Sequence, residues 1–190
     1  MGKIVISENV ALDGVVQDPT GEEGSGRGAW FARVTDRDRQ EWAKLGLDEA
    51  LAAKALLLGR RSFEFFAGRW PSRTGEWAHR LNSMPKFVVS TTLDDAKAWN
   101  NSAVLTGDVV SEVWTLKHTV NGEIVVYASA QLVHTLIEHD LVDELRLTIY
   151  PFVVGTGARL FGETSAMKAL RLVATRTIGD GLALLTYQRA

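Results

Sequence analysis

The fold of this chain is decided by residues 56–73, LLLGRRSFEFFAGRWPSR. Its leucines, Leu56 to Leu58, form a continuous apolar run, which is typical of a strand buried on both faces of a parallel sheet. The run ends at Gly59, and two arginines and a serine follow at once. Arginine side chains are seldom buried without a partner. The chain therefore leaves the core at Gly59, and a short helix is predicted over 62–67.

The same succession of apolar strand and amphipathic helix runs through the whole chain. Strands are predicted over residues 3–9, 54–58, 86–91, 104–105, 123–128, 143–150, 171–178 and 182–189. Helices are predicted over residues 35–51, 62–67, 75–83, 106–119 and 129–139. This alternation favours a mainly parallel sheet with helices on both faces. Gly179-Asp180-Gly181 separates the last two strands and predicts an antiparallel hairpin. We expect an α/β fold and a single domain over 1–190.

Three local patterns make this prediction more specific. Thr35 and Asp38 have the spacing of a capping box and predict the start of a helix. Strict alternation of apolar and polar residues over 143–150 predicts a strand with one buried face. The segment 17–29 holds four glycines and a proline. Loops of that length inside a compact domain are often functional, so it is a candidate part of a site.

The composition excludes several classes of function. The chain has 190 residues, a net charge of −2 and no cysteine. That charge argues against a nucleic-acid or anionic-membrane partner, and no disulfide or thiolate site is possible. No apolar stretch has membrane-spanning length and no export signal is recognised, so a cytoplasmic protein is expected. The four histidines are scattered singly, and neither a metal site nor a histidine-based catalytic site is predicted.

Small or polar residues follow three of the predicted strands, at 59–62 (GRRS), 90–92 (STT) and 128–130 (ASA). Ligands of open parallel sheets bind at the carboxyl ends of the strands. The N-termini of the following helices offer free N–H groups, and arginine adds a bidentate positive charge, so both suit phosphate. The sequence therefore predicts a site for a ligand with several phosphates. It has neither a GxGxxG fingerprint nor a P-loop, which argues against a Rossmann cofactor or a P-loop nucleotide.

Each of these features also has a purely structural interpretation. Arginines at a helix start are usually solvated or paired. Ser129 is compatible with a simple N-cap, and Asp13 before Gly14 with a turn residue. Trp30 and Trp70 are each compatible with a core or loop-packing aromatic residue.

Four stretches together resemble a known family. They are VALDG (10–14), LLGRRSFEFF (57–66), MPKFVVSTTL (84–93) and SAQLVHTLIEHDLVDELRLTIYPFVVGTGARLF (129–161). Their order and spacing resemble the dihydrofolate-reductase-like family. Within it, the chain is similar to small proteins related to the C-terminal reductase domain of the riboflavin-biosynthesis deaminase–reductase. The resemblance implies a three-layer α/β/α fold, NADPH as hydride donor and a homodimer.

The resemblance also implies roles for individual residues. The cofactor would be bound by Ala11, Gly14, Gly59, Arg60, Arg61, Ser62, Ser90, Thr91, Ala128, Ser129, Ala130 and Leu132. Within that set, 59–62 would hold the phosphates, and Ser90 and Thr91 would lie near the 2′-phosphate. Asp13 is the candidate proton donor. Trp30 would face the substrate pocket. For a reductase, we expect the aromatic side chains of Trp30, Phe66 and Trp70 to shape that pocket.

Two positions depart from the family pattern. Glycine is common in the family where this chain has Ala128 and Ser129, and the reductase domains of riboflavin synthesis usually carry glutamate where this chain has Tyr127. The first hypothesis is an NADPH-dependent reductase of a small polar substrate, heterocyclic or sugar-derived. It would be similar to 5-amino-6-(5-phosphoribosylamino)uracil reductase or dihydrofolate reductase. The alternatives are a catalytically silent nucleotide-binding or regulatory module and a structural dimerisation unit.

Overall fold

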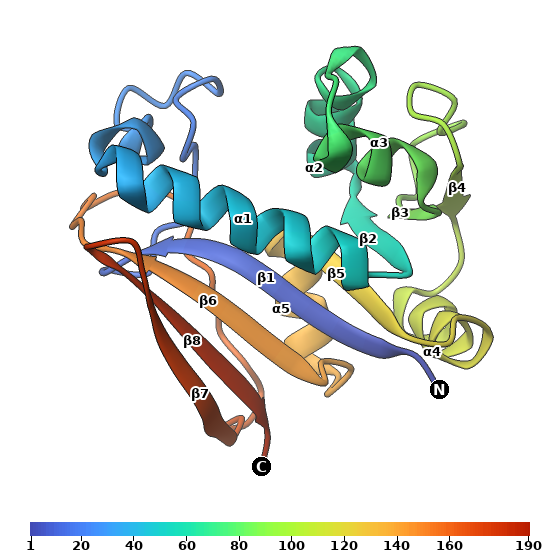
Figure 1. The fold of residues 1–190 in the computed structure, drawn as a ribbon. Coiled ribbons are helices and arrows are strands. Elements are labelled where there is room, and N and C mark those ends of the chain that lie inside the picture. The colour runs from blue at the N-terminus through green and yellow to red at the C-terminus, as the bar shows by residue number, and fades with distance from the viewer.

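The computed structural model describes residues 1–190 and contains one eight-stranded sheet (Figure 1). The strands are β1 (Lys3–Ala11), β2 (Ala55–Gly59), β3 (Lys86–Val89), β4 (Ser102–Leu105), β5 (Glu123–Tyr127), β6 (Glu144–Tyr150), β7 (Leu170–Ile178) and β8 (Leu182–Arg189). The α-helices are α1 (Asp36–Ala52), α2 (Arg60–Ala67), α3 (Glu76–Ser83), α4 (Val109–Thr119) and α5 (Ala130–Glu138). Two short 3₁₀ turns, Trp30–Arg33 and Trp70–Ser72, complete the regular structure.

The strands lie in the order β4-β3-β2-β5-β1-β6-β8-β7. All pairs from β4 to β6 are parallel, whereas β8 pairs with β6 and β7 in the antiparallel sense. The mainly parallel sheet and the C-terminal hairpin predicted from the sequence are confirmed.

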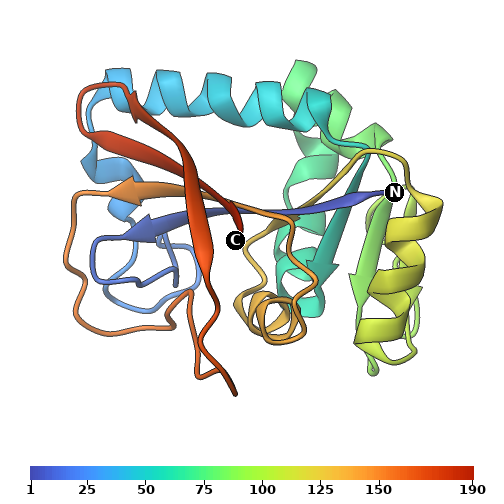
Figure 2. The ribbon, with the colours of Figure 1, turned by 90° about the horizontal axis from the view of Figure 1, so that it is seen from below.

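Helices cover both faces of the sheet and make three layers (Figure 2). Successive residues of β1 point to opposite faces, because side chains alternate along a strand. Ile4 and Ile6 belong to a core cluster with Leu136 of α5, whereas Val5 belongs to another with Ala50 of α1. None of the helices is long and apolar enough to span a bilayer.

Two local predictions had different outcomes. The capping box is present, since the Thr35 side chain accepts a hydrogen bond from the Asp38 N–H and the Asp38 carboxylate accepts one from the Thr35 N–H. The single buried face predicted for 143–150 is wrong, because the sheet is covered on both sides here. Arg146 is half-buried between three carboxylates under α1, and Tyr150 is buried against Trp30.

β1 is paired over a longer stretch with one neighbouring strand than with the other, and this difference leaves a gap in the sheet. On one side β1 pairs with β6 as far as Ala11, opposite Tyr150. On the other side its pairing with β5 stops at Ser7, opposite Tyr127. The last residues of β1 therefore have a neighbouring strand on one side only, and the gap lies where β2 and β5 end, which is where a parallel sheet places its ligands.

Candidate functional site

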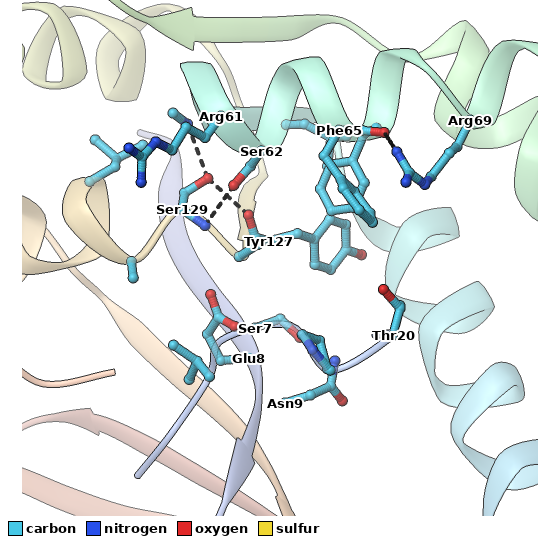
Figure 3. A pocket seen from close by; sticks show the side chains of 18 of the residues that line it. Ser7, Glu8, Asn9, Thr20, Arg61, Ser62, Phe65, Arg69, Tyr127 and Ser129 are labelled. Atoms are coloured by element: carbon cyan, nitrogen blue, oxygen red, sulfur yellow. Dashed lines mark hydrogen bonds between the residues drawn. The ribbon is translucent and has the colours of Figure 1, made fainter. Parts of the chain in front are cut away.

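A cavity of about 950 Å³ lies at this opening (Figure 3). Its wall comes from β1, the loop after β1, α1, α2, the segment after α2, and the start of α5. Most of the residues that sequence analysis selected are brought together in this wall. They are Gly59, Arg60, Arg61, Ser62, Phe66, Trp70, Ala128, Ser129, Ala130 and Leu132.

At one end of the cavity the first turns of α2 and α5 are joined by serine hydrogen bonds. The Ser129 backbone N–H donates to Ser62 Oγ at 2.9 Å (Figure 3). The Gly59 N–H donates to Ser129 Oγ at 3.0 Å, and that hydroxyl donates to the Tyr127 carbonyl. The Ser129 side chain does not cap α5, so the N–H groups of the first turn of α5 have no side-chain partner there.

The backbone in front of α5 is held in an unusual conformation. Ala128 and Ser129 have φ values of 51° and 65°, in the left-handed region that glycine adopts most easily. A non-glycine residue in this region costs about 1 kcal/mol or more. The hydrogen bonds of Ser129 to both neighbouring segments maintain the conformation.

The two arginines at the same end have different partners. Arg60 pairs with Glu64 at 2.7 Å and donates to Thr92 Oγ1 at 2.7 Å. Arg61 is exposed and makes no ion pair. Because Arg61 has no carboxylate partner and the start of α5 is uncapped, this end of the cavity is suited to an anionic ligand.

The opposite end of the cavity is aromatic. Trp77 lies between Trp42 and Trp70, with ring centroids 5.6 and 5.4 Å away. Trp42 Nε1 donates to Asn9 Oδ1 at 2.7 Å. Trp77 Nε1 and the Tyr127 hydroxyl are buried without a hydrogen-bond partner, and burial raises the Tyr127 pKa. Buried polar atoms normally have partners, so these two are available to a bound ligand.

Glu8 is the most deeply buried acidic residue of the wall, with 6% of its surface exposed. Burial raises the pKa of its carboxyl to about 8, and Oε1 has no hydrogen-bond partner. Sequence analysis missed Glu8, although a signal was present. Ile4, Ile6 and Val10 occupy the alternate inward positions of the same strand, so a charged residue at the position between them stands out.

The loop after β1 forms part of the wall, as its length suggested. Asp18 is buried and its carboxylate accepts hydrogen bonds from the Glu23 and Ser25 N–H groups, both at 2.9 Å. Glu22 forms an ion pair with Arg69, which follows α2. The buried Asp18 carboxylate therefore stabilises the conformation of the loop. The ion pair of Glu22 and Arg69 connects the loop to the segment after α2 on the other wall of the cavity.

Some residues selected from the sequence lie outside the cavity wall. Asp13 accepts a hydrogen bond from the Gly155 N–H at 2.7 Å, and this bond lowers the pKa of its carboxyl. An ionised carboxylate holds no proton to donate, so this geometry does not favour Asp13 as the acid. Ala11 and Gly14 flank the same turn, where the Gly14 N–H donates to the Ala11 carbonyl at 2.8 Å.

The remaining predicted residues have structural contacts. Trp30 is only 2% exposed and packs edge-on against Tyr150, with ring centroids 4.9 Å apart. Ser90 Oγ accepts from the N–H groups of Thr92 and Leu93 in the turn after β3. Ser90 and Thr91 do not line the cavity. Arg60 does line it, and its guanidinium donates to Thr92 Oγ1 in the same turn as Ser90 and Thr91.

Several aromatic lining residues were not selected from the sequence. Trp42 lies within α1, and Phe31 lies in the 3₁₀ turn Trp30–Arg33. Helical spacing does not separate a side chain that faces a core from one that faces a cavity at the same level. No pattern in the sequence identifies these residues as lining residues.

Known proteins resemble this chain over nearly its whole length. The uncharacterized protein YyaP of Bacillus subtilis (strain 168) is 30% identical over 193 residues, covering 97% of this chain and 94% of YyaP. A protein from Shewanella sp. PV-4 assigned to riboflavin biosynthesis has a structure with a TM-score of 0.78 and 20% identity, and 99% of each chain is covered. Dihydrofolate reductase from Enterococcus faecalis, complexed with NADP(H) and RAB-propyl, has a TM-score of 0.62 and 16% identity, covering 98% of this chain and 96% of the reductase.

These structural similarities show the fold, and the three-layer arrangement is the dihydrofolate-reductase-like fold predicted from the sequence. The sequence profile of the RibD C-terminal domain matches residues 2–184. The chain belongs to the family of the RibD C-terminal domain.

Proposed function

We propose that this protein is an NADPH-dependent reductase. The observation that supports this most is the junction of α2 and α5, where Ser62 and Ser129 bond to each other beside the uncapped start of α5. Arg60 and Arg61 add positive charge at the same place. A pyrophosphate has the charge and the acceptor oxygens that such a junction recognises.

The residues present fit the cofactor. The pyrophosphate would be held between the two helix starts by Gly59, Arg60, Arg61 and Ser62 on one side and by Ala128, Ser129, Ala130 and Leu132 on the other. Arg60, bonded to Thr92 next to Ser90 and Thr91, would recognise the 2′-phosphate. Ala11 and Gly14 would border the nicotinamide from the turn after β1. The family often has glycine where this chain has Ala128. The β-carbon of Ala128 would limit how closely a pyrophosphate can approach the backbone.

The bound cofactor supplies a hydride, and the chain supplies binding, orientation and a dry environment. The aromatic end, including Phe66, Trp70 and Trp77, would hold a small polar substrate with a reducible C=N or C=O group. The unpaired Trp77 Nε1 and Tyr127 hydroxyl would orient it by hydrogen bonds. The loop fastened by the ion pair of Glu22 and Arg69 would exclude water.

The proposal is tested by thermal unfolding with NADPH, with NADH and without ligand. Saturation at 100 times the dissociation constant adds about 2.7 kcal/mol to the folded state. For a domain of this size that raises the midpoint by about 5–10 °C. We expect the full shift with NADPH, a smaller one with NADH, and none when Arg60 and Arg61 are both replaced by alanine. No shift with either nucleotide would overturn the proposal.

A nucleotide-binding module without turnover is the second candidate. It is favoured by the position of Asp13, whose carboxylate is engaged by the Gly155 N–H outside the cavity. Binding of NADPH without its oxidation, in a screen of C=N and C=O compounds, would favour this candidate over the reductase.

We further propose that the protein acts as a homodimer in the cytoplasm, as the family resemblance implies. The edge strand β7 exposes Leu170, Leu172 and Val173. An exposed apolar edge strand favours association with a second copy. Light scattering on the purified protein measures the oligomeric state directly.

A further inference from the structure

Glu8 is a buried acid that the proposed function has not yet used. Its carboxyl projects from β1 into the cavity (Figure 3), and Oε1 has no hydrogen-bond partner. The preceding residue, Ser7, is paired with Tyr127, and Ser129 follows two residues later. Since neighbouring strands are about 4.8 Å apart, Glu8 lies close to Ala128 and Ser129, the segment in front of α5 that is bonded to the first turn of α2.

The position of Glu8 defines which part of a dinucleotide it would meet. Arg60 and Thr92 lie where the 2′-phosphate of the adenosine half is proposed to bind. A pyrophosphate at Ser129 then directs the other half of the dinucleotide, which carries the nicotinamide, toward β1. Glu8 is the acidic residue of β1 in the cavity wall.

The groups that face Glu8 from neighbouring elements leave its charge uncompensated. β6 places Leu147 opposite it, and the lining residues of α5 are uncharged. The titratable residues elsewhere in the wall are Tyr127 on β5, Glu49 on α1, Glu22 and Glu23 on the loop, and Arg60, Arg61, Arg69 and Arg73 on or after α2. None of them shifts the pKa of Glu8, which burial alone raises. Glu8 is therefore protonated at neutral pH while the cavity holds no added charge.

We propose that Glu8 is the proton-exchanging group of this cavity, protonated when the reduced nicotinamide is bound and ionised when the oxidised nicotinamide is bound. This inference rests on the proposed function. The oxidised ring carries a positive charge, which an adjacent carboxylate stabilises in a dry cavity, whereas the reduced ring is uncharged. The two charges, one on the ring and one on Glu8, appear and disappear together.

The proton and electron balance of the proposed reaction agrees with this role. The substrate carbon of a C=N or C=O group receives a hydride, which carries both electrons. The substrate nitrogen or oxygen receives the proton that Glu8 releases, giving CH–NH or CH–OH. Glu8 is left as the carboxylate beside the oxidised ring, and water returns a proton to it after the oxidised cofactor leaves.

The experiment needs no substrate, because NADP⁺ and NADPH are themselves the probes. Calorimetric titrations at pH 7, in two buffers that differ in ionisation enthalpy, count the protons released on binding. We expect nearly one proton per site with NADP⁺ and none with NADPH in the natural protein. Glu8→Gln, which resembles the protonated form, releases none with either nucleotide. The exposed Glu163 lies outside the cavity, and Glu163→Gln is expected to behave as the natural protein.

The pH dependence of affinity gives a second readout. The ratio of the NADPH and NADP⁺ dissociation constants should change by up to about tenfold per pH unit between pH 6 and pH 8, in favour of NADP⁺ at the higher pH. Both nucleotides carry the same 2′-phosphate, so its titration cancels in the ratio.

Each outcome decides one claim. Binding of both nucleotides without proton release, and with a pH-independent ratio, would overturn the role of Glu8 and leave the proposed function intact. Absence of binding by the natural protein would overturn the proposed function together with this inference. If Glu8→Gln does not fold, the proton count of the natural protein still decides the inference.

Discussion

The hydroxyl oxygen of Ser62, in the first turn of α2, accepts a hydrogen bond from the backbone N–H of Ser129 at 2.9 Å. The bond joins two helix starts that are 67 residues apart in the sequence. It fixes the separation of the two groups of N–H donors that are proposed to hold the pyrophosphate. The relative position of α2 and α5 therefore determines the shape of the end of the cavity where phosphate is proposed to bind, called the phosphate end below.

Replacement Ser62→Ala removes the acceptor of this bond. Leaving the Ser129 N–H without its partner should cost about 1 kcal/mol of unfolding free energy and weaken NADPH binding roughly tenfold. Denaturant unfolding and fluorescence titration measure the two effects. Ser83→Ala, on α3 and outside the cavity, is the matched control, since its hydroxyl bonds only to Arg80 O. Equal NADPH affinity in both variants would contradict the prediction.

The two arginines should have separable effects on cofactor choice. Arg60→Ala is expected to weaken NADPH binding roughly 10- to 100-fold and leave NADH binding nearly unchanged, because Arg60 lies at the proposed 2′-phosphate site. Arg61→Ala should weaken the binding of both NADPH and NADH, because both nucleotides carry the pyrophosphate. Titration of each variant with both nucleotides separates the cases. Arg33→Ala, an exposed residue outside the cavity, should change neither affinity.

Replacement Ala128→Gly tests the β-carbon at the phosphate end. It removes the left-handed strain at φ 51° but adds backbone entropy to the unfolded chain, so stability should change by less than about 1 kcal/mol. Removal of the β-carbon should tighten NADPH binding severalfold. Ala29→Gly provides the same change at φ 63° outside the cavity. A gain in affinity in both variants, or in neither, would argue against the steric explanation.

The raised pKa of Glu8 predicts how stability depends on pH without any ligand. In the unfolded chain Glu8 ionises near pH 4.5, whereas in the folded protein its pKa is about 8. The folded state therefore binds the extra proton between these values, and stability falls as pH rises, by roughly 1.4 kcal/mol per pH unit. The slope ends above pH 8. Glu8→Gln should lack it, and unfolding curves of the two proteins at pH 5, 6, 7 and 8 measure the difference.

Asp38 has the opposite dependence. Burial opposes its ionisation, but hydrogen bonds from Gly181, Thr35 and Asp180 outweigh burial and lower its pKa to about 2. Its contribution to stability is present above pH 3.8 and is lost as pH falls toward 2. Asp38→Asn should therefore cost about 2 kcal/mol at pH 7, or roughly 4–8 °C in midpoint.

The exposed Asp36 provides the control for that measurement. Asp36→Asn, in the same first turn of α1, removes only a surface ion pair with Arg39 and should change stability little. The cost of Asp38→Asn should also shrink below pH 3.8, because the natural carboxyl then becomes protonated. A cost that is constant down to pH 2 would show that Asp38 acts by shape and not by charge.

The sequence by itself determined the succession of elements, and it selected residues of 59–62 and 128–132 that the fold brings into one cavity wall. The apolar run Leu56 to Leu58, ended by Gly59, specifies a buried strand that is followed by a short helix, predicted from residue 62 and observed from Arg60. The capping box of Thr35 and Asp38 specifies where α1 begins. These signals are local, because each depends on a few consecutive residues whose burial pattern and hydrogen bonds are fixed within one element.

Only the tertiary structure decided which residues meet in the cavity. No pattern in the sequence predicts that β5 stops opposite Ser7 while β1 continues. This difference places Glu8 at the opening. Trp42 of α1 and Trp77 of α3 are aromatic residues within helices, and only their position at the opening decides that they line the cavity. The physical reason is that capping and the apolar pattern of one element depend on a few consecutive residues, whereas an unpaired strand edge exists only once all the neighbouring strands are in place.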